Sequence, residues 1–267
     1  MIVQHNIASM NANRQLGIVG NNLSKATEKL SSGYRINRAA DDAAGLSISE
    51  KMRGQVRGLN RASDNAQDGI SLIQTAEGAM DQQHAILQRA RELAVQAAND
   101  TNVTADRTAI SEELDQLKQE FDRITSQTEF NTQKLCDGTF TGKKFQVGAN
   151  SGQTITVSIS KTSMTDIKGS VASNATATAA IKKIDTNITN LSKTRSKLGA
   201  IQNRLEYTVK NDDNAAENIQ NAESRIRDVD MADEMTRFSK ESILQQAATS
   251  MLAQANQQNQ GVLSLLQ

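Results

Sequence analysis

An apolar residue returns at every seventh position between residues 42 and 99. The positions are Met52, Leu59, Ala66, Ile73, Met80, Leu87 and Ala94. A seven-residue period held over this length, with no proline, predicts one long helix whose apolar seam packs against other helices. At ~1.5 Å per residue such a helix would be roughly 85 Å long. Because a helix cannot bury its own seam, the rest of the chain has to supply partner helices.

Four further stripes with alternating spacings of three and four predict those partners. The first stripe is Leu16, Val19, Leu23, Ala26 and Leu30, and the second is Ile110, Leu114, Leu117, Phe121 and Ile124. The third runs without a slip from Ile181 to Ile226, although four of its positions hold Arg195, Gln202, Asp212 and Glu223. The last stripe is Leu244, Ala248, Met251, Ala255, Gln258, Val262 and Leu265. The chain is therefore expected to run out along one long helix and back along another.

Between residues 128 and 160 the hydrophobic period changes to two. Residues 153–160 alternate apolar and polar positions and predict a half-buried strand, with residues 140–147 as its antiparallel partner. Residues 161–179 are rich in Ser, Thr and Ala and show no period, so we expect a solvent-facing loop. The predicted fold is mainly α: an elongated helical bundle or coiled-coil rod, with paired terminal helices and a small β-hairpin at its distal end.

The division of the chain follows from its turn signals. Ser31-Ser32-Gly33 ends the first helix, and Asp41 or Asp42 is expected to cap the long one. We expect a first helix and connector in 1–41, an outgoing rod part with the hairpin in 42–180, a return helix in 181–228 and a last helix in 229–267. Four glycines within the first long helix allow either a close backbone neighbour or simple solvent exposure; they are Gly54, Gly58, Gly69 and Gly78.

Composition narrows the classes of partner. Lys plus Arg and Asp plus Glu both number 30, so the formal net charge is zero, and neither nucleic acid nor a membrane surface is predicted as a partner. No apolar run reaches the ~18 residues of a membrane span. The first residues lack a basic segment followed by an apolar one, so no cleaved signal peptide is predicted and these features alone indicate a cytoplasmic protein. The single cysteine, Cys136, is interpreted as a small buried apolar residue.

Residues that could carry catalysis are scarce. His5 and His84 are the only histidines and stand far apart in the sequence. The segment 138–144 resembles a phosphate loop but has three residues between its glycines instead of four, and Lys144 stands where Ser or Thr would meet a magnesium ion. A hairpin turn is the better interpretation. We predict no catalytic residue, no metal site and no cofactor.

The two terminal helices have apolar faces that only they can cover within the chain. A pair of helices leaves much of such a surface in water, and an exposed apolar face of this size usually marks a partner site. The expected partner is another copy of the same chain. The residues that we expect to form these contacts are Leu16, Val19, Leu23, Leu30, Leu244, Met251, Leu252, Val262, Leu263, Leu265 and Leu266.

Four segments resemble bacterial flagellin. They are LSSGYRINRAADDAAGL at 30–46, GISLIQTAEGA at 69–79, AESRIRDVDMA at 222–232 and MLAQANQ at 251–257. With the spacing between them, the resemblance covers roughly residues 1–160 and 180–267, and the outer domains that many relatives insert are missing. It implies a filament subunit whose paired terminal helices form an inner tube. It also implies an extracellular location, reached through the flagellar export channel without a cleaved signal, which overrides the cytoplasmic interpretation.

The same resemblance implies several partners. These are other copies of the chain, the filament cap, hook-junction proteins, a flagellar export chaperone and the flagellin-sensing Toll-like receptor of the host. The surface that matches the family's receptor contact comprises Gln88, Arg89, Arg91, Glu92, Leu93 and Glu113.

Two other functions remain as alternatives. A hook–filament junction protein shares the terminal helices, although the motifs of the rod region favour flagellin. A soluble coiled-coil adaptor that binds unrelated helices would share the periodicity. Seeded growth of long uniform filaments, seen by electron microscopy, distinguishes a flagellin from both. A flagellin with an enzyme domain in its middle is excluded, because the insert is missing.

Overall fold

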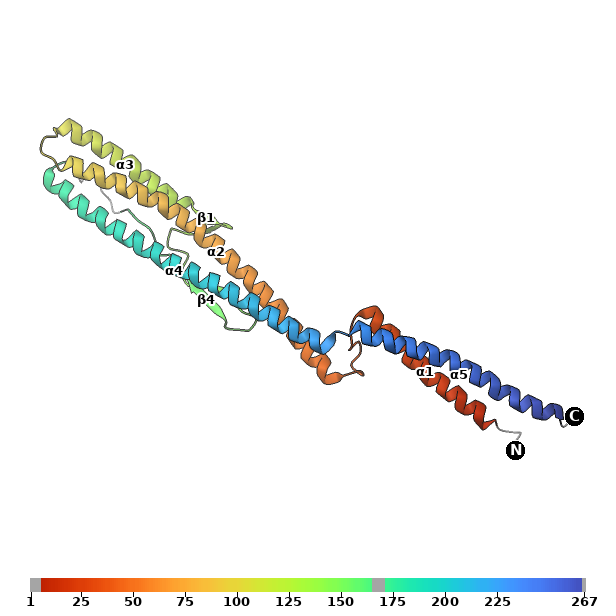
Figure 1. The fold of residues 1–267 in the computed structure, drawn as a ribbon. Helices are drawn as coiled ribbons and strands as arrows, with labels where there is room; N and C mark the ends of the chain where they lie inside the picture. The colour runs from red at the N-terminus through yellow and green to blue at the C-terminus, as the bar shows by residue number, and fades with distance from the viewer. Residues whose placement is uncertain (1–5, 165–170, 266–267) are drawn as a thin grey trace. The chain divides into compact units, whose positions relative to one another are not determined.

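Helices dominate the chain, which confirms the mainly α prediction. Figure 1 shows a computed structural model that describes residues 6–164 and 171–265, with side chains described as far as residue 257. The helices of this described part are α1 (Ile7–Ser32), α2 (Ala43–Ala97), α3 (Thr104–Gln127), α4 (Asn174–Arg227) and α5 (Met231–Leu265). The absence of proline allows α2 and α4 to continue over 55 and 54 residues without a break.

The chain divides into two compact units. The terminal unit comprises Met1–Gly54 and Asn218–Gln267, and the bundle unit comprises Gln55–Glu217. Both boundaries fall inside long helices, because α2 and α4 contribute residues to each unit. The functional division expected at residues 41/42 and 228/229 stays a prediction.

The core of the bundle unit lies between α2, α3 and α4. On α2 the heptad residues Ala66, Ile73, Met80, Leu87 and Ala94 are completely buried, as the period predicts. The other two helices contribute the apolar residues of their predicted stripes; the buried ones are Ile110, Leu114, Phe121, Ile184, Leu191, Leu198 and Leu205. Three seams that meet in one core allow each helix to bury its apolar face within the chain.

Polar residues in the α4 seam are accommodated in two ways. Arg195 lies at the edge of the seam and forms ion pairs with Glu77 at 3.6 Å and Asp81 at 3.1 Å, both on α2. Asp212 lies inside the seam and is only 5% exposed. The helical spacing of the α4 seam therefore continues through two charged residues. Arg195 pairs with carboxylates at the edge of the seam, and Asp212 is enclosed within it.

The segment before α4 corrects two predictions. α4 begins at Asn174, seven residues before the predicted start at Ile181, and Ala177 is completely buried on its first turns. Thr162, Met164 and Val171 are also buried, so the described residues of 161–179 do not form a solvent-facing loop. The error arose because the buried residues Thr162, Met164, Val171 and Ala177 stand among Ser, Thr and Ala without a regular spacing.

Two antiparallel hairpins connect α3 to α4. Strands β3 (Lys143–Gln146) and β4 (Thr154–Val157) pair with Lys143 opposite Val157, which confirms the predicted hairpin. Ile155, Val157 and Ile159 are buried and the residues between them are exposed, as the alternation predicts. The pair β1 (Glu129–Phe130) and β2 (Gln133–Lys134) was not predicted.

The larger hairpin packs along the part of α2 that contains Gly58 and Gly69. A methyl group at Gly58 would lie 2.8 Å from Ala149 Cβ, so glycine is required for the loop to approach the helix. At Gly69 the nearest side-chain atoms, of Leu205 and Phe145, would lie 3.4 Å from an added methyl group, an ordinary contact distance, and Gly54 and Gly78 face open space. The hairpin was expected at the distal end of the rod. It lies instead beside α2, because the chain turns back after α3.

Candidate functional site

The terminal helices α1 and α5 pack against each other, as expected (Figure 1). Asn6 Nδ2 donates to the Ala255 carbonyl at 3.0 Å, and Ser9 Oγ donates to Asn256 Oδ1 at 2.7 Å. Of the predicted stripe on α1, Ala26 is buried, while Leu16, Val19, Leu23 and Leu30 are only half-buried. Two helices therefore cover each other's stripes in part.

Large apolar side chains of this pair remain in solvent. Ile7 is 67%, Met10 68% and Ile243 66% exposed. Leu244 and Met251, which we expect to contact other copies, are exposed, and Leu252 is half-buried. The other four expected contact residues, Val262, Leu263, Leu265 and Leu266, lie outside the residues whose side chains are described. Rows of exposed large apolar residues are typical of a surface that is covered by a partner.

The predicted receptor surface centres on Arg89 of α2. Its Nη2 donates to Glu113 Oε1 of α3 at 2.9 Å, and its Nη1 donates to Glu92 Oε2 at 3.3 Å. The hydrogen bond to Glu113, followed by that to Glu92, raises the pKa of the Arg89 guanidinium above its usual value. Gln88, Arg89, Glu92 and Glu113 are all exposed, so the structure places these four predicted residues on one accessible surface.

Two other residues predicted for this surface lie elsewhere. Arg91 Nε donates to Asp185 Oδ1 of α4 at 2.7 Å, whereas Arg89 bonds to α3. Residues two apart on a helix point about 200° away from each other, so the two arginines lie at opposite edges of the exposed face of α2. Leu93 is 2% exposed and belongs to the core. The Leu93 side chain packs inside the bundle unit and is not accessible there, so its part in a receptor contact stays a prediction.

A connector joins α1 to α2 in the terminal unit. α1 ends at Gly33, whose φ of 75° is left-handed, and whose N–H donates to the Lys29 carbonyl at 2.9 Å. Asp42 Oδ1 accepts the Gly45 N–H at 2.8 Å, so Asp42 rather than Asp41 caps α2. Asp41 instead accepts the Arg38 N–H at 3.0 Å. That bond lowers the pKa of the Asp41 carboxyl, with further contributions from the Asn37 N–H and nearby lysines.

Tyr34 of this connector forms a cation–π contact with Arg227, the last residue of α4. The Arg227 Cζ lies 4.8 Å from the centre of the Tyr34 ring, and Arg227 Nη1 donates to Glu50 Oε1 at 2.8 Å. On the same ring the Arg53 Cζ lies at 5.8 Å, and Arg53 forms an ion pair with Glu223 at 3.3 Å. Sequence reasoning missed this cluster, because no local pattern connects residues separated by nearly 200 positions.

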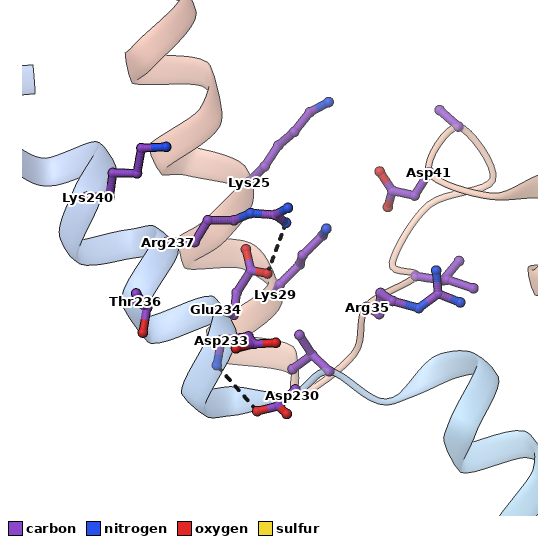
Figure 2. A pocket seen from close by; sticks show the side chains of 13 residues that line it. Lys25, Lys29, Arg35, Asp41, Asp230, Asp233, Glu234, Thr236, Arg237 and Lys240 are labelled. Carbon is purple, nitrogen blue, oxygen red and sulfur yellow. Dashed lines mark hydrogen bonds and ion pairs between the residues drawn. The ribbon is translucent and has the colours of Figure 1, made fainter. Parts of the chain in front are cut away.

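Beside the connector lies a concavity of about 740 Å³, lined by α1, the connector and α5. Cationic and acidic side chains lie around it (Figure 2), and its lining includes five cationic residues and four carboxylates. Glu234 is buried and pairs with Arg237 at 3.5 Å, and Asp230 Oδ1 accepts the Ala232 N–H at 2.9 Å at the start of α5. Glu234 and Asp230 therefore each have a bonding partner within the chain.

Other chemistry is limited in the described part of the chain. Among the described residues no group of three or more His, Cys, Asp or Glu side chains could hold a metal ion. Cys136 is completely buried, as interpreted from the sequence, and burial together with Asp137 raises the pKa of its thiol to about 11. Within the same described residues, the helices are too polar for any of them to cross a membrane.

Comparison with known proteins gives matches over most of the chain. Residues 3–141 match the family model for the bacterial flagellin N-terminal helical region, and residues 181–266 match that for the C-terminal helical region. A flagellin of Halalkalibacterium halodurans is 58% identical over 271 residues, and one of Bacillus subtilis is 49% identical over 303 residues. Both alignments cover 100% of this chain and 100% of the relative. The crystal structure of Bacillus cereus flagellin is 34% identical with a TM-score of 0.50, and the match covers 56% of this chain and 88% of that one.

Proposed function

Because the chain belongs to the bacterial flagellin family, and is thus a structural subunit of the extracellular flagellar filament rather than an enzyme, we propose specific surfaces for its contacts. The exposed apolar faces of α1 and α5 form the contacts between filament subunits. The accessible surface of Gln88, Arg89, Glu92 and Glu113 binds the flagellin-sensing Toll-like receptor.

The uneven burial of apolar side chains supports the first assignment. In α1 the only buried side chain among the described residues is Ala26, although the helix has 26 residues. Large apolar residues in water are unfavourable, and fully covering a Leu, Ile or Met side chain contributes ~1.5–3 kcal/mol. The terminal unit therefore gains free energy when other copies cover α1 and α5, and the same gain repeats at every subunit of a filament.

A charge on this face tests the assignment. Ile243→Glu or Met251→Glu places a carboxylate on the proposed contact surface, and we expect filament growth from seeds to be lost. Tyr207→Glu is the matched control, because Tyr207 is an exposed large residue of the bundle unit. Sedimentation and electron microscopy measure growth, and circular dichroism verifies the helix content of each variant. Normal filaments from both α5 variants would contradict the proposal.

The second assignment rests on the geometry around Arg89. Arg89 is half exposed and is held in a fork between Glu113 and Glu92. An exposed ion pair of this kind contributes only ~0–1 kcal/mol to folding. Truncating an arginine that anchors a protein interface can weaken binding by ~2 kcal/mol or more. A receptor contact would thus make Arg89 far more important for binding than for stability.

Two alanine variants separate these roles. We expect Arg89→Ala to weaken receptor binding at least tenfold, by about 1.4 kcal/mol or more, while the melting temperature barely moves. Arg123→Ala is the control, because Arg123 forms a similarly exposed pair with Glu120 on α3. Binding is measured by surface plasmon resonance with the purified receptor ectodomain. Equal affinities of wild type and Arg89→Ala would return Arg89 to a purely structural role.

We further propose that the chain leaves the cell through the flagellar export channel without a cleaved signal, bound before export by a chaperone. In the filament it would adjoin the cap and the hook-junction proteins. Family membership supports this route. Mass spectrometry of the protein secreted by a flagellated host without its own flagellin should find the N-terminal peptide that begins at Met1 or Ile2. A secreted form that lacks the first 15–30 residues would contradict export without cleavage.

A further inference from the structure

A polar pocket of about 300 Å³ lies in the bundle unit between α3, α4 and residues 160–163. Phe121 of α3 and Leu191 of α4 form the apolar part of its lining, and both are buried. Thr162 and Asn187 also line it and are more than nine-tenths buried, at 6% and 8% exposed. Nine of the eleven lining residues are polar, so a ligand of this pocket has to be polar as well. The volume is at the small end of the range of small-molecule sites.

Three lysines surround the same pocket. Lys161 comes from the segment before α4, and Lys193 and Lys197 come from α4 itself. The lining contains no Asp or Glu, and within residues 6–164 and 171–257 none of the three lysines forms an ion pair. Lys193 and Lys197 are four residues apart, a spacing at which like charges on a helix repel. The concavity beside the connector differs, because carboxylates stand among its cations.

We propose that this pocket binds a small organic phosphate with hydroxyl groups, of the sugar phosphate class. Lysine ammonium groups bind phosphate as point charges, and three of them meet at this pocket. Hydroxyl and amide side chains both donate and accept hydrogen bonds, as a polyol ligand requires. The Thr162 and Thr194 hydroxyls donate to the carbonyls of Cys136 and Asn190, so toward a ligand they act as acceptors for its hydroxyl groups. Asn187 adds an amide beside the apolar wall of Phe121 and Leu191. The volume suits a single sugar ring with its phosphate.

A titration of the full-length monomer, labelled with ¹⁵N, tests the ligand class by nuclear magnetic resonance. The probes are glucose 6-phosphate, glucose and inorganic phosphate, each in chloride buffer of matched ionic strength. We expect saturable shifts of amides in residues 160–163 and 187–197 with glucose 6-phosphate, at least threefold tighter binding than inorganic phosphate, and no saturation with glucose. Shifts that do not saturate, or that sodium chloride reproduces, would overturn the site. Equal affinities for glucose 6-phosphate and inorganic phosphate would overturn the sugar part of the proposal.

Paired substitutions on one helix locate the site. Lys193→Gln combined with Lys197→Gln should weaken glucose 6-phosphate binding at least tenfold. Lys182→Gln combined with Lys183→Gln removes two exposed charges from the same helix outside the pocket and should change the affinity less than twofold. Lys161→Gln, on the other side of the pocket, should weaken binding at least threefold and provides an independent test. Wild-type affinity in both pocket variants would overturn the proposal.

Discussion

The bundle unit and the terminal unit use the same helical spacing of apolar residues with opposite results. In the bundle unit three helices and a hairpin enclose one core, and the heptad positions of α2 from Ala66 to Ala94 are fully buried. In the terminal unit α5 is the helix that packs along α1 among the described residues, and Leu16, Val19 and Leu23 stay half-buried. The difference lies in the number of neighbouring helices and not in the stripe. An apolar stripe therefore predicts which face of a helix will be covered. The number of neighbouring helices decides whether that face is covered within one chain or needs other copies.

Shortening the terminal unit should give the largest contrast. Removing residues 262–267 takes away apolar residues predicted to contact other copies, each worth ~1.5–3 kcal/mol on burial, so polymerisation should be abolished. The bundle unit should keep its helix content. Sedimentation and circular dichroism on one sample measure both effects. Ser264→Ala, within the same segment, is the control and should polymerise normally. Filaments formed by the shortened chain would show that residues 262–267 are not needed for contacts between copies.

One leucine from each unit compares the energies of burial directly. Leu87→Ala empties a completely buried site in the bundle unit and should destabilise it by ~2–5 kcal/mol. Leu16→Ala removes a half-buried side chain of α1 and should cost below ~1.5 kcal/mol in the monomer, because less area leaves water there. Urea denaturation followed by circular dichroism gives both values. Equal costs would mean that the terminal unit is as well packed as the bundle unit.

A tight turn in the bundle unit offers a stabilising change. Thr132 has a φ of 63°, a left-handed conformation in which its branched side chain is strained. Thr132→Gly should raise the free energy of unfolding by about 1 kcal/mol. Gly142→Ala is the mirror control, since Gly142 has a φ of 65° and should lose a similar amount of stability. Thermal unfolding measures both variants. A destabilised Thr132→Gly would show that the Thr132 side chain contributes more than its strain costs.

The smallest effect concerns a buried charge in the α4 seam. Burial, and then the charge of Asp213, raises the pKa of the Asp212 carboxyl above its ordinary value of 3.8. A raised pKa means that the folded state favours the protonated acid, so this group loses stabilising effect as pH rises through its folded pKa. Asp212→Asn should stabilise the bundle unit at pH 7 by less than ~1 kcal/mol and flatten the pH dependence above pH 4.

Asp213→Asn is the control for that change. Asp213 is exposed and its Oδ1 accepts the Ser63 hydroxyl at 3.0 Å. Its charge is the smaller cause of the raised Asp212 pKa, so an amide there should flatten the profile less than Asp212→Asn does. Melting temperatures measured between pH 4 and pH 8 give the comparison. Parallel profiles for wild type and Asp212→Asn would show that Asp212 titrates in the same way in the folded and unfolded states.

Much of the fold could be predicted from the sequence, because periodicity reports which face of a helix is buried. The α4 stripe continued through Arg195 and Asp212, and the structure follows it. The start of α4 was missed because Ala177 and its neighbours show no contrast between apolar and polar positions. The β1–β2 hairpin was missed because Thr132 occupies a turn position where glycine would have been the recognisable signal.

The candidate contact surfaces were predicted less completely. A sequence motif consists of consecutive residues, but in a helix the side chains of consecutive residues point in different directions. Arg89 and Arg91 therefore bond to different helices, and Leu93 enters the core. The Tyr34–Arg227 contact and the three lysines around the polar pocket join elements that are distant in sequence. Only the tertiary arrangement brings those residues together.

The burial of Cys136 has a kinetic consequence. With a thiol pKa of about 11, roughly one Cys136 side chain in ten thousand is a thiolate at pH 7 in the folded state. Packing then hides that sulfur from reagents and from the same residue of another copy. Alkylation of this thiol can proceed only during transient opening of the bundle unit, so its rate counts those openings. The alkylation rate of Cys136 therefore reports how often the bundle unit opens. While opening is rare, the copies in a polymer form no disulfide cross-links through Cys136.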